Sequence, residues 1–299
     1  MLRPTLIAIG IAGACLFAAG PAEATFPGAD GRIAFSYTDG TRGLVATMKP
    51  DGSDVRYLRA GGEPAWSADG HRLAFVSANG NQSEIYMMRA DGSNVRRLTF
   101  TPDLNELSPT FSPNGKRIVA WTAEYPPASR HHHVVSMRSD GSHRRVLARR
   151  GLQPEWAPNG KHIVYVGRDG GIRIMRPDGT HKRRLYDSPA FDGFLPRYAP
   201  AGDSIVFGRC RLADACATTE WVEIRVSGGE VERLPISSHV FDVQPAPSGD
   251  CFVGWRWRYG NGSEGRNILT SGLGCPVAGW LTDYLKPQAA TTPSWQPVA

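Results

Sequence analysis

The sequence lacks the motifs that usually mark an enzyme. It has no Gly-x-Ser-x-Gly nucleophile elbow, no His-Glu-x-x-His zinc motif, no P-loop and no dinucleotide-binding fingerprint. An Asp-x-Asp-x-Asp-Gly calcium loop is also missing. We therefore predict no catalytic residue, no metal site and no cofactor, and we do not expect an enzyme.

Apolar runs long enough to cross a membrane are missing as well. The longest run, residues 6–19, follows the basic residue Arg3 and precedes the small-x-small sequence Ala22-Glu23-Ala24. This pattern predicts a signal peptide over residues 1–24 and a secreted or periplasmic mature chain without a transmembrane segment. A lipoprotein processed at Cys15 is the alternative.

Cysteine is scarce, with five residues in the chain of 299. Cleavage after residue 24 removes Cys15 and leaves Cys210, Cys216, Cys251 and Cys275, an even number that suits disulfides in an oxidising compartment. Cys210 and Cys216 bracket a short loop and are expected to pair, which leaves Cys251 and Cys275 by elimination. Neither pair has CxxC spacing, so zinc binding is less favoured.

Glycine (34) and proline (23) are abundant, which favours short strands and turns over long helices. A Pro-x-aromatic triplet recurs roughly every 45 residues, a spacing that indicates a repeat architecture. The triplets begin at Pro64, Pro109, Pro154, Pro196 and Pro293, with a degenerate copy at Pro245.

Each triplet is followed by a tight turn, an apolar run, a third segment and an Asp-Gly pair. Asp-Gly supplies the positive φ of a hairpin turn. A fourth segment then ends on a leucine that usually follows an arginine. Each repeat is therefore expected to be a four-stranded antiparallel meander. The Asp-Gly pairs begin at Asp51, Asp91, Asp140 and Asp178, and the leucines are Leu58, Leu98, Leu147, Leu185 and Leu234.

The two ends of the chain complete one repeat. The N-terminal unit begins at an expected second strand, residues 32–35, and the chain ends on an unpaired first strand, residues 293–298. We therefore predict an all-β protein, a six-bladed β-propeller of four-stranded antiparallel blades. The C-terminal strand would close it by pairing with the N-terminal blade, so that residues 25–299 form one domain.

The repeat resembles the WD-like repeat of TolB-type β-propellers, best in residues 64–70 and 85–99. The resemblance covers nearly the whole mature chain, although Gly228-Gly229 replaces Asp-Gly in the fifth blade. It implies an extracytoplasmic propeller that binds a protein or another ligand. We expect no counterpart of the N-terminal α/β domain of TolB in the residues before Phe26.

Polar residues near the expected innermost strands are candidate ligand-binding residues at the mouth of a central channel. The alternative is a structural role in a polar, water-filled channel. Glu155 and Arg197 hold the same place in consecutive blades, so we predict that they pair. The candidates are Glu63, Glu106, Glu155, Arg197, His239 and Asp242.

Positive charge is concentrated in residues 143–184, which contain eleven lysines and arginines but three acids, although the whole chain is only +6. Such a sector can attract an anionic envelope polymer, and the alternative is a solvated rim. Nucleic acid is not expected, because no nucleic-acid-binding signature accompanies the charge. The predicted basic sector is Arg144, Arg145, Arg149, Arg150, Lys182, Arg183 and Arg184.

Together these features predict a monomeric, exported binding module or scaffold whose partner is a protein or an anionic polymer. The alternative is a propeller enzyme of the lyase or lactonase type, with a metal-assisted site in the central channel.

Overall fold

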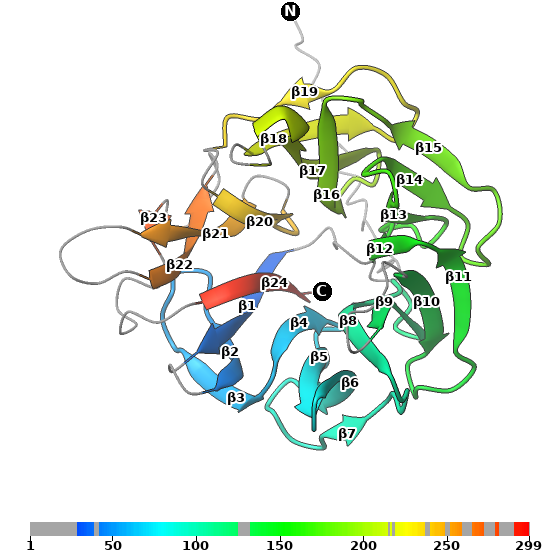
Figure 1. Ribbon diagram of the computed structural model, residues 1–299. Helices are drawn as coiled ribbons and strands as arrows, with labels where there is room; N and C mark the ends of the chain where they lie inside the picture. The colour runs from blue at the N-terminus through cyan, green and yellow to red at the C-terminus, as the bar shows by residue number, and fades with distance from the viewer. Residues whose placement is uncertain are drawn as a thin grey trace, which may run out of the picture.

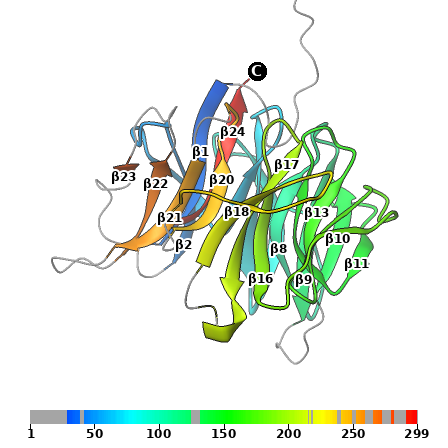
Figure 2. The same ribbon diagram turned by 90° about the horizontal axis from the view of Figure 1, so that it is seen from above.

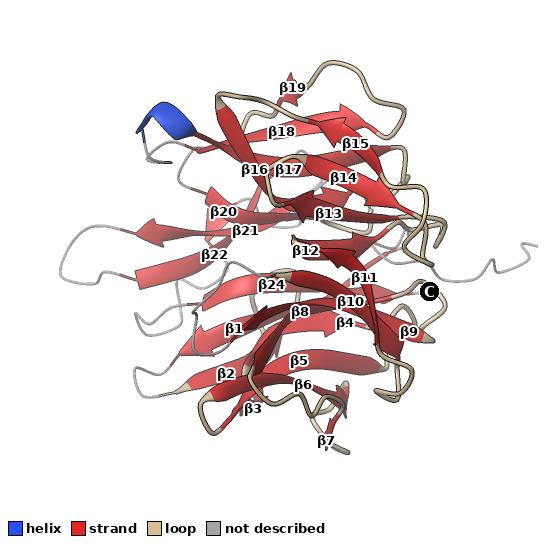
Figure 3. Cartoon of the chain, turned by 45° about the vertical axis from the view of Figure 1, so that its right-hand side comes forward, coloured by secondary structure: helices blue, strands red, loops and turns tan. Residues whose placement is uncertain are grey.

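The computed structural model of the chain is built almost entirely from β-strands (Figure 3). It describes residues 29–38, 42–124, 132–214, 216, 219–236, 240–248, 252–258, 265–271, 279–280 and 290–298. The expected signal peptide lies outside these residues, as do Cys251, Cys275 and His239. The described part contains one short 3-10 helix, η1 (Leu212–Asp214), and none of its helices could cross a membrane.

The strands form six four-stranded antiparallel sheets, numbered here in chain order (Figure 1). The first sheet is β24 (Ala290–Val298), β1 (Ala29–Thr38), β2 (Gly43–Met48) and β3 (Arg56–Ala60). The second is β4 (Gly62–Trp66), β5 (Arg72–Asn79), β6 (Gln82–Arg89) and β7 (Arg96–Arg97). The third is β8 (Leu104–Phe111), β9 (Arg117–Glu124), β10 (His133–Arg138) and β11 (Arg145–Arg149).

The remaining three sheets follow the same order from innermost to outermost strand. The fourth is β12 (Gly151–Trp156), β13 (Ile163–Gly167), β14 (Ile172–Met175) and β15 (Arg183–Tyr186). The fifth is β16 (Phe191–Tyr198), β17 (Ser204–Arg211), β18 (Thr219–Arg225) and β19 (Glu232–Arg233). The sixth is β20 (Val240–Pro245), β21 (Phe252–Arg258), β22 (Gly265–Ser271) and β23 (Gly279–Trp280). Figure 2 shows these sheets from the side.

The two ends of the described chain meet in the first sheet. β24 pairs antiparallel with β1, where Trp295 lies opposite Ile33 and Ser294 opposite Ala34. The pairing predicted from the sequence is confirmed, and the red and blue strands lie side by side in Figure 1. β24 also contacts β4 and β20, and each of the other innermost strands contacts the next. The six sheets thus follow one another around a common centre.

Adjacent sheets are held together by apolar side chains that alternate along each strand. In the fourth sheet, Val164 packs with Ile205 and Phe207 of the fifth sheet. The preceding residue, Ile163, packs instead with Val119 of the third sheet. Successive side chains of a strand point to opposite faces, so each middle sheet buries both of its faces against its neighbours.

The Asp-Gly turns have a second role that the sequence pattern does not show. Gly141 has a φ of +89°, as expected for the turn, but a Cβ there would also lie 2.3 Å from the carbonyl oxygen of Leu98. At Gly179 a Cβ would lie 3.0 Å from the carbonyl oxygen of Leu147. These leucines close the preceding sheets, so glycine also permits the close approach of one sheet to the next.

The register corrects one prediction about the sixth sheet. Pro245 lies opposite Phe252, which is the place that the aromatic residues Trp156 and Tyr198 hold in their sheets. Val243 therefore stands where the other repeats have proline, and the predicted copy at Pro245 is wrong by two residues. The error arose because the alignment of the sixth repeat relied on a proline, and the apolar pattern around Pro245 is too weak to correct it.

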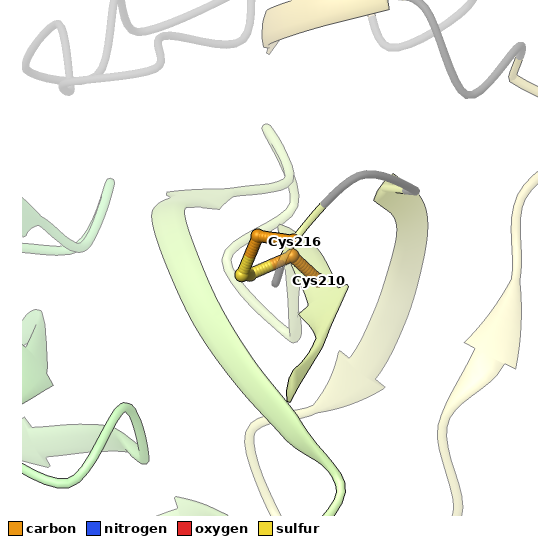
Figure 4. The surroundings of a disulfide bond; sticks show 2 residues. All are labelled: Cys210 and Cys216. Carbon is orange, nitrogen blue, oxygen red and sulfur yellow. A yellow bond between two sulfur atoms is a disulfide. The ribbon is translucent and has the colours of Figure 1, made fainter. Parts of the chain in front are cut away.

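The disulfide predicted between Cys210 and Cys216 is confirmed, with a Cα separation of 4.7 Å (Figure 4). It joins the end of β17 to the segment after η1 and closes a short loop in the fifth sheet. This loop lies between β17 and β18.

Candidate functional site

Each innermost strand from the second to the sixth sheet contains one non-glycine residue with a left-handed backbone. Each of these residues lies where the pairing with the second strand shifts register, which is a β-bulge. Bulges re-aim side chains, and left-handed residues are concentrated at functional sites. The residues, with φ between 47° and 52°, are Glu63, Ser108, Gln153, Leu195 and Asp242.

Side chains at the bulges connect one sheet to the next. The Ser108 backbone N–H donates to Glu63 Oε2 at 2.6 Å, and the Ser108 hydroxyl donates to the same oxygen at 3.1 Å. The Leu195 N–H donates to Gln153 Oε1 at 2.8 Å. A bulge frees a backbone N–H from the strand ladder, and here the preceding sheet supplies its acceptor. Ser108 and Leu195 were not among the predicted site residues.

Arg197 joins three sheets through two carboxylates. Its Nη1 lies 3.3 Å from Glu155 Oε2, which confirms the predicted pair. Its Nη2 lies 3.1 Å from Asp242 Oδ1, a contact that the sequence did not predict. The side chains of Glu155 and Asp242 are only 8% and 5% exposed, so both ion pairs are shielded from water. We call Glu63, Glu155, Arg197 and Asp242 the inner-strand cluster.

The inner-strand cluster has more carboxylates than guanidinium groups. Burial raises the pKa of Glu63; its hydrogen bonds from Ser108 oppose the rise, while the nearby Asp242 charge adds to it. Burial also raises the pKa of Asp242, although Arg197 partly offsets the rise. Burial disfavours the charged form of Arg197, but Asp242 and Glu155 outweigh it and raise the pKa of Arg197. The pKa of Glu63, in the second sheet, is therefore influenced by the charges of Arg197 in the fifth sheet and Asp242 in the sixth.

Glu106 lies in a different environment. Its buried Oε1 accepts hydrogen bonds from Arg144 Nε at 3.0 Å and from the Thr101 hydroxyl at 3.1 Å. Burial raises the pKa of Glu106, and the ion pair with Arg144 opposes the rise. The structure thus pairs a predicted channel residue, Glu106, with a residue of the predicted basic sector, Arg144.

The other residues of the predicted basic sector differ in their surroundings. Arg184 pairs with Asp187 and, at 3.2 Å, with Asp169. Lys182 Nζ donates to the Gly179 carbonyl at 2.7 Å. Arg149 and Arg150 are exposed at the end of β11. Arg145 and Arg183 reach across to the next sheet, to the carbonyl oxygens of Pro177 at 3.1 Å and Val226 at 2.6 Å.

Within the described residues, no group of three or more His, Cys, Asp and Glu is placed to hold a metal ion. The inner-strand cluster instead offers buried carboxylates and one guanidinium as hydrogen-bonding and charged groups. The arrangement is suited to binding a polar segment of another molecule, because desolvated charged hydrogen bonds are stronger than exposed ones.

Comparisons with known proteins agree with the fold described above. A family model described as the TolB beta propeller domain matches residues 33–176. The crystal structure of TolB from Acinetobacter baumannii aligns with a TM-score of 0.71 and 18% identity, covering 90% of this chain and 67% of that one. The chain is a TolB-like β-propeller.

Other solved structures share the fold of this propeller at lower identity. A chain of a nidogen/laminin complex aligns with a TM-score of 0.66 and 11% identity, over 89% of this chain and 98% of that one. Oligogalacturonate lyase from Vibrio parahaemolyticus aligns with a TM-score of 0.57 and 10% identity, over 81% and 74%. No curated protein sequence matches the chain. These likenesses establish the fold alone.

Proposed function

We propose that this TolB-like propeller is an exported, six-bladed binding module or scaffold that binds a protein partner at the inner-strand cluster. The six sheets, the contacts between successive innermost strands and the β24–β1 pairing support a closed ring in a single domain over residues 25–299. The signal sequence expected in residues 1–24 supports export. The proposed module acts as a monomer.

One unsatisfied donor carries the proposal. Among the described residues, Arg197 Nε is buried and has no hydrogen-bond partner, although both Nη atoms of the same guanidinium are paired. A buried donor without a partner costs about 1–3 kcal/mol. A carbonyl oxygen of a bound peptide would recover this free energy, and a basic side chain of the same peptide would be attracted to the surplus carboxylates.

Variants of Glu63 test the site. Immobilised wild-type protein should retain a partner from envelope extract, and Glu63→Gln should retain about tenfold less, a loss of about 1.4 kcal/mol. The glutamine oxygen can still accept the Ser108 N–H, so folding should be preserved, as thermal unfolding would verify.

Glu232→Gln removes an exposed carboxylate from the outermost strand of the fifth sheet and is the matched control. It should retain the partner as well as the wild type does. Equal retention by Glu63→Gln would place the binding site elsewhere.

An enzyme of the lyase or lactonase type is the second candidate. It is favoured by the raised pKa values of two inner-strand carboxyl groups, Glu63 and Asp242, because such shifts are common among acid–base groups. The metal content of protein purified without a histidine tag separates the two candidates. A stoichiometric divalent ion would favour the enzyme, and its absence from active binding protein would favour the module.

A further inference from the structure

Like charges lie directly opposite one another in successive sheets. Arg72 of β5 pairs in register with Arg89 of β6, and Arg117 of β9 pairs with Arg138 of β10. Opposed like charges in an antiparallel pair are destabilising. Repeating this arrangement in neighbouring sheets lowers the stability of the fold, so the arginines are not there to stabilise the packing of the sheets.

The outermost strand adds a third basic residue on the same face. Arg96 lies opposite Met87, two residues before Arg89, and residues two apart share a face. In the third sheet, Arg145 lies opposite Ser136, two residues before Arg138. The fourth sheet continues the pattern. The basic arc is defined by these nine positions, three from each of three sheets: Arg72, Arg89, Arg96, Arg117, Arg138, Arg145, His162, Arg176 and Arg183.

The charges of neighbouring members of the arc act on one another. Burial lowers the pKa of Arg117, and the charges of Arg145 and Arg138 lower it further. Burial likewise lowers the pKa of His162, with added contributions from Arg183 and Arg176. The triads of the third and fourth sheets are therefore local concentrations of positive charge.

Hydrogen bonds show that the triads are contiguous. Arg96 Nη2 donates to the carbonyl oxygen of Ser139 at 3.4 Å, beside Arg138 of the next sheet. The contact between Arg145 and Pro177 likewise brings the triad of the third sheet beside Arg176 of the fourth sheet. Each guanidinium retains further donors, since one contact uses one of its five N–H groups. The arc thus runs without interruption along the second, third and fourth sheets, which are consecutive in Figure 1.

The first sheet shows how such a triad is neutralised. There Asp54, with a left-handed φ of 52°, lies 2.7 Å from Arg32 Nη1 and 2.8 Å from Arg56 Nη2. The same left-handed turn position holds Asn94, His143 and His181 in the next three sheets, with φ between 51° and 55°. The bridging carboxylate is therefore missing from all three sheets of the arc.

Other acids only partly offset the charge of the arc. Asp69 lies 3.3 Å from Arg72. The turn residues Asp91, Asp140 and Asp178 accept hydrogen bonds from the Ser or Thr two residues later. These hydrogen bonds, and to a smaller extent the charges of Arg89, Arg138 and Arg176, lower the pKa of the three carboxyl groups. The third sheet has Asn114 in the place of Asp69. The side chains at the strand ends are exposed and make no salt bridge within the described residues; they are Arg89, Arg138 and Arg176.

The fifth sheet ends the arc with the opposite charge. Glu232 lies opposite Glu223, so an acid stands where Arg96, Arg145 and Arg183 stand in their sheets. Glu223 and Glu232 line an open depression of about 680 Å³ together with two further acids, Asp203 and Glu230, and one basic residue, Arg225. At the equivalent place in the second sheet, the charged residues that line an open depression of about 570 Å³ are Arg72, Arg89, Arg96 and one acid, Asp91. One end of the arc is thus bounded by negative charge.

We propose that the basic arc is a docking surface for a linear anionic glycan, which runs along the second to fourth sheets and stops before the fifth. This proposal does not rest on the proposed function of the inner-strand cluster. Guanidinium groups bind carboxylate and sulfate-like oxygens through paired donors, and an open, contiguous row of such groups suits a chain better than a small enclosed anion.

Two other anionic partners fit less well. A planar membrane surface laid on this arc would also meet the acidic fifth sheet and be repelled by it. Single-stranded nucleic acid is usually held by stacking on aromatic side chains, and no Phe, Tyr or Trp is among the described residues that line the depression beside Arg72, Arg89 and Arg96. A flexible glycan can follow the basic triads alone.

Heparin, as a sulfated glycan probe, tests the proposal with the full mature chain. Titration calorimetry should show binding that weakens steeply as salt is raised. The combined substitutions Arg89→Gln, Arg138→Gln and Arg176→Gln should weaken binding at least about tenfold without loss of thermal stability.

Arg225→Gln is the matched control, because Arg225 holds the same strand position in the acidic fifth sheet. It should change the affinity by less than about twofold. An equal loss in Arg225→Gln, unchanged binding in the triple variant, or binding to anionic phospholipid vesicles without binding to heparin would each overturn the proposal.

Discussion

The inner-strand cluster and the basic arc handle charge in opposite ways. In the cluster, Arg197 lies between two carboxylates from neighbouring sheets, and all three side chains are largely buried. In the arc, guanidinium groups lie opposite one another across strands; Arg138 is exposed, and Arg117 opposite it is half-buried. Charges that hold sheets together are thus paired with opposite charges. Charges left beside like charges lower stability, so their repetition points to binding rather than to folding.

The largest effect should come from breaking the buried side of this contrast. Arg197→Gln leaves Glu155 and Asp242 buried without their counter-charge, which should cost about 3–5 kcal/mol of unfolding free energy. Urea denaturation measures the loss. Arg209→Gln is the control, because its partner Glu220 is more exposed and the cost should stay below about 1 kcal/mol. Equal losses would mean that burial does not distinguish these pairs.

A double-mutant cycle sharpens the same point. Glu155→Gln should destabilise the wild type but have little effect on the Arg197→Gln background, giving a coupling of about 1–3 kcal/mol. Asp242→Asn should behave in the same way, since both carboxylates share one guanidinium. Additive costs in urea denaturation would show that the three residues act independently.

In the basic arc, removing a charge should raise the unfolding free energy instead of lowering it. Arg138→Gln removes one member of a like-charge pair and should raise the unfolding free energy by up to about 0.5 kcal/mol. Arg225→Gln, in the acidic fifth sheet, should lower it by a similar amount. A loss above about 1 kcal/mol for Arg138→Gln would show that the arc stabilises the fold.

The smallest effect is a pH dependence within the arc. Burial and the charges of Arg183, Arg176 and Lys161 lower the pKa of His162 below its usual 6.5, so the unfolded chain binds its proton more readily. Stability should therefore decline as pH falls below about 6.5 and be fully present above it. His162→Gln should reduce this slope in melting temperature measured against pH. An unchanged slope would remove His162 from the triad.

The sequence predicted the repeated parts of the fold well, because local chemistry defines them. Asp-Gly pairs, Pro-x-aromatic triplets and the unpaired terminal strand were enough to predict four-stranded sheets and the pairing of β24 with β1. The left-handed bulges were not predictable, since Glu63 and Ser108 carry no glycine signal. The contact between Arg197 and Asp242 was hidden because the proline alignment placed the sixth innermost strand two residues too late.

A local excess of lysine and arginine in the sequence predicts a basic segment, but it does not show on which face of a strand each residue lies. Arg144 and Arg145 are neighbours in sequence, yet Arg144 reaches the buried Glu106 and Arg145 extends to the next sheet. Arg89 and Arg138 lie outside or just before the dense basic segment and were missed. Register, rather than composition, brings them together with Arg96 and Arg145.

The most direct test of the glycan-binding proposal is to restore, at a single turn residue, the carboxylate that neutralises the arginines of the first sheet. Arg117 donates to Ser136 Oγ at 3.0 Å, as Arg32 does to Thr47 Oγ1 at 3.2 Å in the first sheet. His143→Asp therefore rebuilds the bridge that Asp54 makes there, and His143→Asn matches its shape without the charge.

The dissociation constant for heparin should rise several-fold in His143→Asp and stay at the wild-type value in His143→Asn. The melting temperature of His143→Asp should not fall, because a new surface ion pair contributes about 0–1 kcal/mol. Equal affinity in the two variants would contradict the link between the unneutralised triads and binding.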